Sequence, residues 1–176
     1  MDDYRKYIGL KKGTVCLADH SEYWKLIFQE EASQIQAVLQ DTIQSIHHVG
    51  STAIPNIKAK PIIDILIGVE GFSSIPIIVA QLEQLGYIYK GENGIPDRHY
   101  FSKGEPRCFH IHLTLSGNAI YNNHLHFLNH LKAHPNLAKA YEKIKMDLAA
   151  KFQNERLQYT EGKDEFIQSI LKLREE

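Results

Sequence analysis

Apolar residues recur along this chain with two different spacings, and these spacings divide it into helices and strands. Between positions 21 and 39 the apolar side chains recur at the spacing that places them on one face of a helix. They are Trp24, Ile27, Phe28, Ile35, Val38 and Leu39. Residues 62–69 read Ile-Ile-Asp-Ile-Leu-Ile-Gly-Val. This segment is apolar on both faces, which predicts a central strand that is covered on both sides.

The other elements follow from shorter apolar runs and from the Gly, Pro and Asn residues between them. Strands are predicted at 45–49, 87–90, 98–102 and 108–115, and a helix at 73–85. After Leu115 the pattern is helical, in pieces at 118–133, 136–153 and 163–174, with breaks at Pro135 and around 159–162. We expect one α/β (α+β) domain over residues 1–176, with a mixed β-sheet, flanking helices and a C-terminal helical group.

Composition is that of an ordinary globular protein. The chain is 43% hydrophobic and 23% charged with a net charge of −1, so no basic footprint for non-specific nucleic-acid binding is expected. No apolar run approaches the roughly 18 residues of a membrane span, and no leader of signal-peptide type follows Met1. Cys16 and Cys108 form neither a metal motif nor a disulfide framework. We therefore expect a cytoplasmic protein without a membrane partner.

Asp64 is the polar exception within the apolar strand. A carboxylate there is unfavourable unless it is paired or bound to a metal, although it could also bond a neighbouring turn at the strand end. His110 and His112 lie two apart on a predicted strand, so their imidazoles point to the same face. Two imidazoles and one carboxylate suit a transition metal better than Mg²⁺. We predict that Asp64, His110 and His112 are catalytic and hold a divalent ion, with Mg²⁺, Mn²⁺ and Zn²⁺ all left open.

A Gly-Ser turn stands directly after the strand at 45–49. Such a turn offers backbone N–H groups and a hydroxyl to a phosphate, although Gly-Ser is also ordinary turn chemistry. We predict that the following residues bind phosphate or substrate: His48, Gly50, Ser51, Thr52, Lys60, Arg98, Arg107, Lys145 and Lys163. Arg98 and Arg107 are the stronger candidates because arginine grips phosphate with two parallel bonds. Most surface lysines are merely solvated.

Other histidine patterns are incomplete. Residues 110–115 partly resemble the histidine-triad motif, in which a strand histidine attacks a phosphate, but Thr114 stands at its third position. The same segment matches one half of the paired His-x-Thr motif of two-histidine phosphoesterases, without a second copy. His126 and His130 have the spacing of a zinc-binding pair, but Phe127 replaces the glutamate of that motif. We expect them to be partly buried surface residues.

A strand, a Gly-Ser turn, a short helical connection and a strand with an acid resemble the nucleotidyltransferase superfamily. More closely, the chain resembles the GrpB family of small bacterial proteins, which is assigned to that fold. The resemblance rests on His-Val-Gly-Ser-Thr-Ala-Ile-Pro at 48–55 and Ala-Lys-Pro-Ile-Ile-Asp-Ile-Leu at 59–66. Nucleotidyltransferases usually carry a second acid where Leu66 stands, whereas an apolar residue is common there in the GrpB family. Leu128-Asn129 replaces an Arg-Asp of the family pattern.

The resemblance implies a fold and a cleft, and it leaves several functions open. One is a metal-dependent nucleotidyl or phosphoryl transferase, or a hydrolase, acting on a small phosphorylated molecule or nucleotide. The alternative is a non-catalytic nucleotide- or CoA-binding module on a degenerate nucleotidyltransferase fold. A third is a protein-interaction domain. The oligomeric state is open as well.

Overall fold

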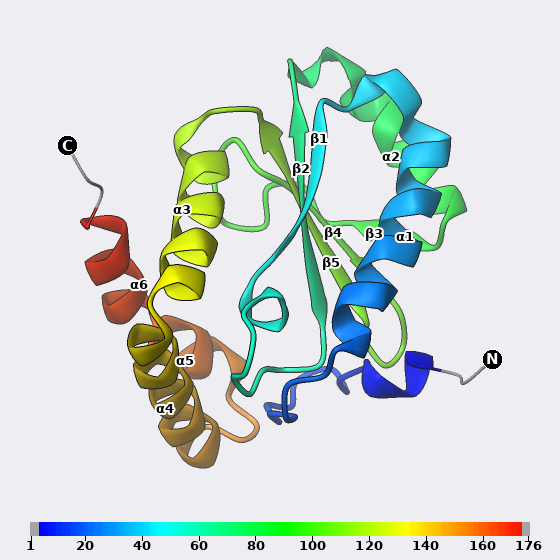
Figure 1. Ribbon diagram of the computed structural model, residues 1–176. Coiled ribbons are helices and arrows are strands. Elements are labelled where there is room, and N and C mark those ends of the chain that lie inside the picture. The colour runs from blue at the N-terminus through cyan, green and yellow to red at the C-terminus, as the bar shows by residue number, and fades with distance from the viewer. Residues whose placement is uncertain (1–3, 174–176) are drawn as a thin grey trace.

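A mixed five-stranded sheet forms the centre of the computed structural model, which describes residues 4–173 (Figure 1). Its strands are β1 (Ser45–Val49), β2 (Ile63–Val69), β3 (Tyr87–Tyr89), β4 (His99–Lys103) and β5 (Phe109–Leu115). Their order is β1-β2-β5-β4-β3. β2 runs parallel to β5, and the other neighbouring pairs are antiparallel. The predicted fold class is therefore confirmed.

Two helices cover one face of the sheet, α1 (Tyr23–Leu39) and α2 (Ile75–Gln84). Alternate residues of β2, among them Ile65 and Ile67, point to this face and pack in the larger apolar core with Trp24 and Phe101. All four side chains are at most 1% exposed. The predicted periodicity of α1 thus corresponds to a face that is removed from water.

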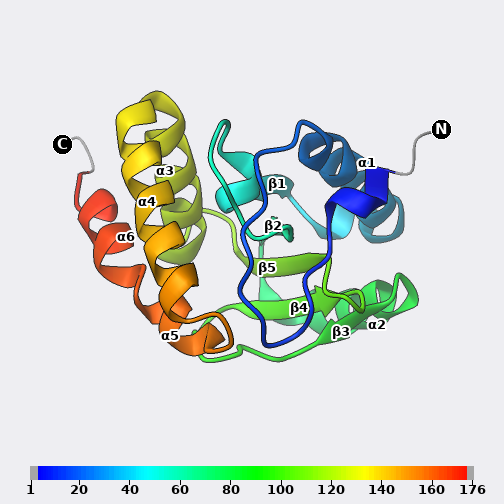
Figure 2. The same ribbon diagram turned by 90° about the horizontal axis from the view of Figure 1, so that it is seen from below.

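The other face carries α3 (Ala119–Ala133), α4 (Pro135–Lys151), α5 (Arg156–Glu161) and α6 (Asp164–Leu171), as Figure 2 shows. The side chain of Asn118 accepts a bond from the Tyr121 N–H and caps α3. Pro135 begins α4, where its missing N–H is not needed. A second, smaller core lies beneath these helices. It includes Val49, Leu66, Leu128, Leu131, Ala138 and Tyr141.

Several boundaries differ from the prediction. The six-residue helix α5 (Arg156–Glu161) overlaps the expected break around 159–162, and its Tyr159 is 1% exposed. A helix this short has too few turns to show a periodic pattern, and its burial stabilises it instead. The last predicted helix ends at Leu171 in the structure, and its predicted end at 174 lies outside the described residues.

Short 3₁₀ helices complete the described chain. They are Tyr4–Tyr7, Gln40–Thr42, Ser51–Ala53 and Phe72–Ser74. None of the helices in residues 4–173 is long and apolar enough to cross a membrane.

Candidate functional site

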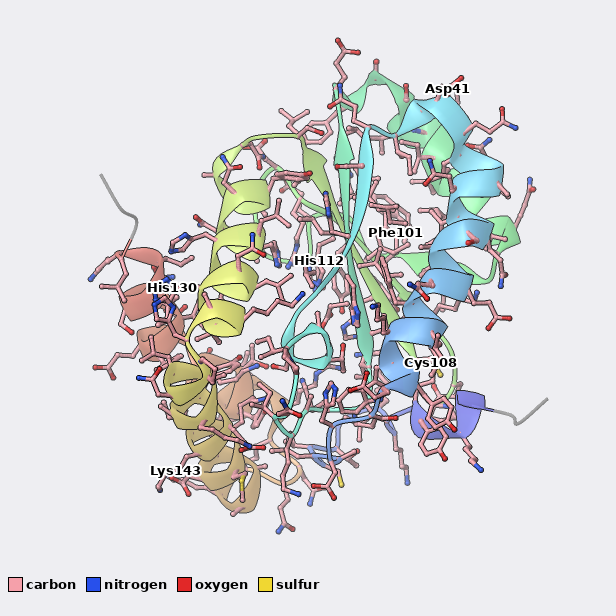
Figure 3. The ribbon with its side chains drawn as sticks, viewed as in Figure 1. Asp41, Phe101, Cys108, His112, His130 and Lys143 are labelled. Atoms are coloured by element: carbon pink, nitrogen blue, oxygen red, sulfur yellow. The ribbon has the colours of Figure 1, made fainter. Side chains whose placement is uncertain are left out.

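Asp64, His110 and His112 meet on the face of the sheet that carries α3. Parallel pairing sets Asp64 opposite His110 in β5. Asp64 Oδ1 lies 3.1 Å from His110 Nδ1 and 3.3 Å from His112 Nε2. The histidine side chains are 7% and 13% exposed and that of Asp64 is 28% exposed, so the carboxylate is the part that reaches solvent. Figure 3 places His112 between the sheet and α3.

The two imidazoles keep the Asp64 carboxylate ionised. Burial raises the pKa of Asp64, but the hydrogen bonds from His110 and His112 outweigh burial and hold that pKa well below its ordinary value. Burial also lowers the pKa of His110 and brings the pKa of the neighbouring His124 to about 3. The His124 ring lies 4.9 Å from that of His112. The Tyr100 ring lies 5.3 Å and 5.5 Å from the rings of His110 and His112.

Whether these three side chains fit a metal ion depends on the ring nitrogens that do not face Asp64, His110 Nε2 and His112 Nδ1. A histidine that binds a metal through one nitrogen usually donates the N–H of the other nitrogen to an acceptor. His110 Nε2 and His112 Nδ1 are buried, and neither has a hydrogen-bond partner among the described residues. Within residues 4–173, no three His, Cys, Asp or Glu side chains are arranged to hold an ion. As arranged, these donors do not fit an ion, and the predicted metal site stays a prediction.

The position of the second acid is also closed to a metal. Leu66 is fully buried and packs in the smaller core with Val49 and Leu128. A carboxylate at this position would lie among apolar side chains and would lack solvent. The two-ion arrangement of nucleotidyltransferases therefore has no equivalent in this part of the fold.

The Gly50 turn lies directly against the Asp64 carboxylate. Gly50 has φ 72°, and a Cβ on it would lie 2.6 Å from Asp64 Oδ2, so only glycine permits this close approach. The Ser51 side chain lies near the Tyr141 hydroxyl, where it lowers the pKa of Tyr141 against the larger, raising effect of burial. The Thr52 hydroxyl donates to the Ile62 carbonyl at 3.3 Å. The Thr52 hydroxyl, which was predicted to bind phosphate, thus already has partners within the protein.

His48, a predicted phosphate- or substrate-binding residue, lies on the opposite face of the sheet from Asp64. It pairs with Ile65 in the sheet, and residues that pair directly share a face. Its ring stacks on Phe28 of α1 at 4.9 Å, and its Nε2 lies 2.9 Å from the Thr52 hydroxyl. Burial lowers the pKa of His48 to about 4. His48 therefore stabilises the Gly50 turn through Thr52, from the face of the sheet that α1 covers.

Three predicted lysines from distant parts of the chain lie near one another, and the charge of Asp64 acts on Lys60 and Lys163. Lys60 precedes β2, Lys145 lies on α4 and Lys163 stands at the start of α6. The Nζ atoms of Lys60 and Lys163 lie 5.0 Å and 4.7 Å from the centre of the same Tyr159 ring. Lys145 Nζ lies 4.9 Å from the Tyr141 ring centre and donates to the Lys58 carbonyl. We call Lys60, Lys145 and Lys163 the lysine cluster.

The lysine cluster lacks matching negative charge. Lys145 is 1% exposed, the other two are partly buried, and no described carboxylate forms an ion pair with any of them. Burial lowers the pKa of Lys60 and of Lys145 to about 7 and that of Lys163 to about 8, and the charge of Lys163 further lowers the first two. A cluster of this kind is electropositive and favours an anion.

Two arginines differ in their relation to this cluster. Arg107 lies close enough to Lys60 for its charge to lower the pKa of Lys60. Burial and the charges of Lys163 and Arg156 lower that pKa more strongly. Arg98 instead donates to the Glu92 and Asn93 carbonyls at 3.1 Å and 2.9 Å. Its guanidinium lies 5.0 Å from the Tyr100 ring centre. Arg98 therefore supports the loop before β4.

Arg156 was missed by the sequence analysis. It begins α5, and its charge lowers the pKa of Lys60 and Lys163, for both of which burial is the larger cause. Arg156 stands three residues before Tyr159, a spacing that puts two residues on the same side of a helix. That signal was unusable because this segment was predicted as a break.

His126 and His130 of α3 and His134 directly after it stack in a row at the surface. The ring centres of His126 and His130 are 5.5 Å apart, and those of His130 and His134 are 4.2 Å apart. His126 Nε2 donates to the Ile170 carbonyl at 3.2 Å and so attaches α6 to α3. These contacts support the expected structural role.

Comparison with known proteins identifies relatives of this chain. The family model described as GrpB protein matches residues 14–173. UPF0157 protein YqkA of Bacillus subtilis is 44% identical over 151 residues, which are 85% of this chain and 44% of that protein. This chain thus spans less than half the length of YqkA. Glutamate-rich protein GrpB of Alkalihalophilus pseudofirmus is 34% identical over 170 residues, which are 93% of this chain and 98% of that protein.

Solved structures agree with these matches. The crystal structure of conserved protein GrpB from Enterococcus faecalis has a TM-score of 0.83 at 34% identity, covering 89% of this chain and 95% of that one. A structure of the Cid1 poly(U) polymerase with MgGTP bound has a TM-score of 0.52 at 13% identity, covering 76% of this chain and 44% of that one. The second likeness concerns the fold alone.

Proposed function

This chain belongs to the GrpB family, and from that premise we propose that it binds a small phosphorylated molecule of nucleotide or CoA type beside Asp64. The lysine cluster and Arg156 would hold the phosphates. Phosphate is the chemical group that these candidate ligands share.

The observation that carries the proposal is the excess of positive charge in the lysine cluster. Buried and partly buried amines that repel one another lose part of their charge, and among the described residues the Asp64 and Glu142 carboxylates act on them in the opposite direction. A phosphate would supply the missing negative charge and form charge-assisted hydrogen bonds with the amines. Ligand binding would therefore relieve a repulsion that is present in the free protein.

Metal-dependent nucleotidyl or phosphoryl transfer, or hydrolysis, is the second candidate. The observation that favours it is the position of Asp64, an ionised carboxylate on a fold shared with Cid1. This candidate predicts turnover of a nucleoside triphosphate with Mg²⁺, Mn²⁺ or Zn²⁺, and loss of turnover in Asp64→Asn. If no product forms with any of these ions, this second candidate is refuted and only the ligand-binding proposal stands.

A thermal-shift panel tests the binding proposal. Ligands are ATP, GTP, UTP, CoA and dephospho-CoA, and a ligand at 100 times its Kd adds about 2.7 kcal/mol of stability. The positive ligand is then titrated into Lys163→Met, in which the thioether retains the apolar stem. We expect binding at least tenfold weaker, which corresponds to about 1.4 kcal/mol.

The matched control is Lys143→Met on α4. Lys143 is 77% exposed and pairs with Asp147 at 2.9 Å, and it points outward in Figure 3. We expect the affinity of this variant to stay within twofold of the wild type. The proposal fails if no ligand of the panel raises the melting temperature, or if the two variants bind alike.

A further inference from the structure

We propose that this phosphate site works without a divalent metal ion, with the lysine cluster supplying the positive charge and Asp64 fixing the two imidazoles. The inference rests on the proposed function and specifies how the same site neutralises its ligand. It departs from the ion-dependent chemistry expected of the fold.

The first argument concerns the protons of His110 and His112. In the observed arrangement each imidazole donates an N–H to Asp64 Oδ1 from the nitrogen that faces the carboxylate. An ion held by the same three atoms would require the near nitrogens to offer lone pairs instead. The protons would then move to His110 Nε2 and His112 Nδ1, which are buried without a described acceptor. Metal binding would thus create two unsatisfied buried donors.

The second argument concerns Asp64 itself. Its Oδ1 accepts from both imidazoles, and its Oδ2 packs so closely against the Gly50 backbone that a Cβ there would lie 2.6 Å away. The place of a second acid is taken by Leu66, which is fully buried. A single carboxylate, with one oxygen already bonded to two imidazoles, is a poor site for hard cations, which require several oxygen ligands.

The third argument is that the charge normally supplied by ions is already present as amines. Lys60 and Lys163 approach one Tyr159 ring from separate segments, and this shared cation–π contact fixes both ammonium groups. Arg156 lies close enough for its charge to act on both of them. Fixed cations of this kind can bind the oxygens of a phosphate chain directly.

Calorimetry with inorganic triphosphate tests the inference, because this probe carries the phosphate chemistry without a base. The wild-type protein is titrated once in EDTA and once in Mg²⁺. We expect the Kd in EDTA to be no more than threefold weaker than in Mg²⁺. Lys163→Met should bind at least tenfold more weakly in EDTA, and Lys143→Met should bind as the wild type does.

Asp64→Asn gives a test whose sign separates the two possibilities. Asparagine retains an oxygen that accepts from the imidazoles, and removing one negative charge should tighten triphosphate binding in EDTA about threefold to tenfold. A metal ligand would behave in the opposite way, and its loss would weaken binding in Mg²⁺. Fluorescence of Trp24, which is 1% exposed, checks that the variant is folded.

The outcomes distinguish this inference from the function on which it rests. Binding only in Mg²⁺, or weaker binding by Asp64→Asn, overturns the metal-independent site and leaves phosphate binding intact. Absence of binding in both buffers overturns phosphate binding itself, and the inference with it.

Discussion

Replacing Gly50 by alanine tests whether the close approach of the turn to Asp64 requires glycine. Gly50 has φ 72° and ψ −174°, a conformation that is essentially restricted to glycine. The added Cβ would lie 2.6 Å from Asp64 Oδ2 and 3.1 Å from Asp64 Cβ. The carboxylate cannot simply retreat, because both imidazoles hold its other oxygen.

The expected loss of stability has two parts. A non-glycine residue in this backbone conformation costs about 1–3 kcal/mol, and overpacking against Asp64 adds about 1–3 kcal/mol. Gly13→Ala is the matched control, since Gly13 has φ +83° and a Cβ added to it would meet nothing within 4 Å. It should show the cost of a side chain at positive φ without the contact to Asp64. Gly50→Ala should therefore be destabilised by about 1–3 kcal/mol more than Gly13→Ala.

Urea unfolding followed by Trp24 fluorescence measures both variants, because Trp24 is the one tryptophan of the chain and is buried. The excess loss should shrink when Gly50→Ala is placed in an Asp64→Ala background, where the close oxygen is absent. The reasoning is refuted if Gly50→Ala costs no more than Gly13→Ala, or if the excess is unchanged without the Asp64 carboxylate.

Two further predictions concern stability. The folded pKa of Lys60 and of Lys145 is about 7, below that of an unfolded lysine, so above pH 7 the unfolded chain binds more protons. The stability of the ligand-free protein should therefore rise between about pH 7 and about pH 9. Melting curves of Lys145→Met should show a smaller rise. A melting temperature that falls with pH in the wild type would contradict the lowered pKa of these lysines. Leu66→Asp should lose about 3–5 kcal/mol in urea unfolding without gaining Mg²⁺ binding in calorimetry, whereas a stable variant that binds Mg²⁺ would show that this position accepts a carboxylate.

Local sequence patterns were sufficient to predict the order of helices and strands and part of the candidate site. Alternation along a strand decides which residues share a face, so the apolar run around Asp64 and the common face of His110 and His112 followed from the sequence alone. Family blocks around Gly50 and Asp64 indicated the fold, which the structure and the relatives confirm. These features depend on neighbours along the chain.

The tertiary structure decided everything that depends on distant partners. Parallel pairing of β2 with β5 brought the histidines to Asp64, and antiparallel pairing of β1 with β2 turned His48 to the opposite face. Packing of α4, α5 and α6 gathered the lysine cluster and added Arg156. Side chains far apart in the sequence meet only when burial of the apolar faces fixes strand order and helix position. The sequence thus determined which groups are available for chemistry, and the nonlocal packing determined which of them act together.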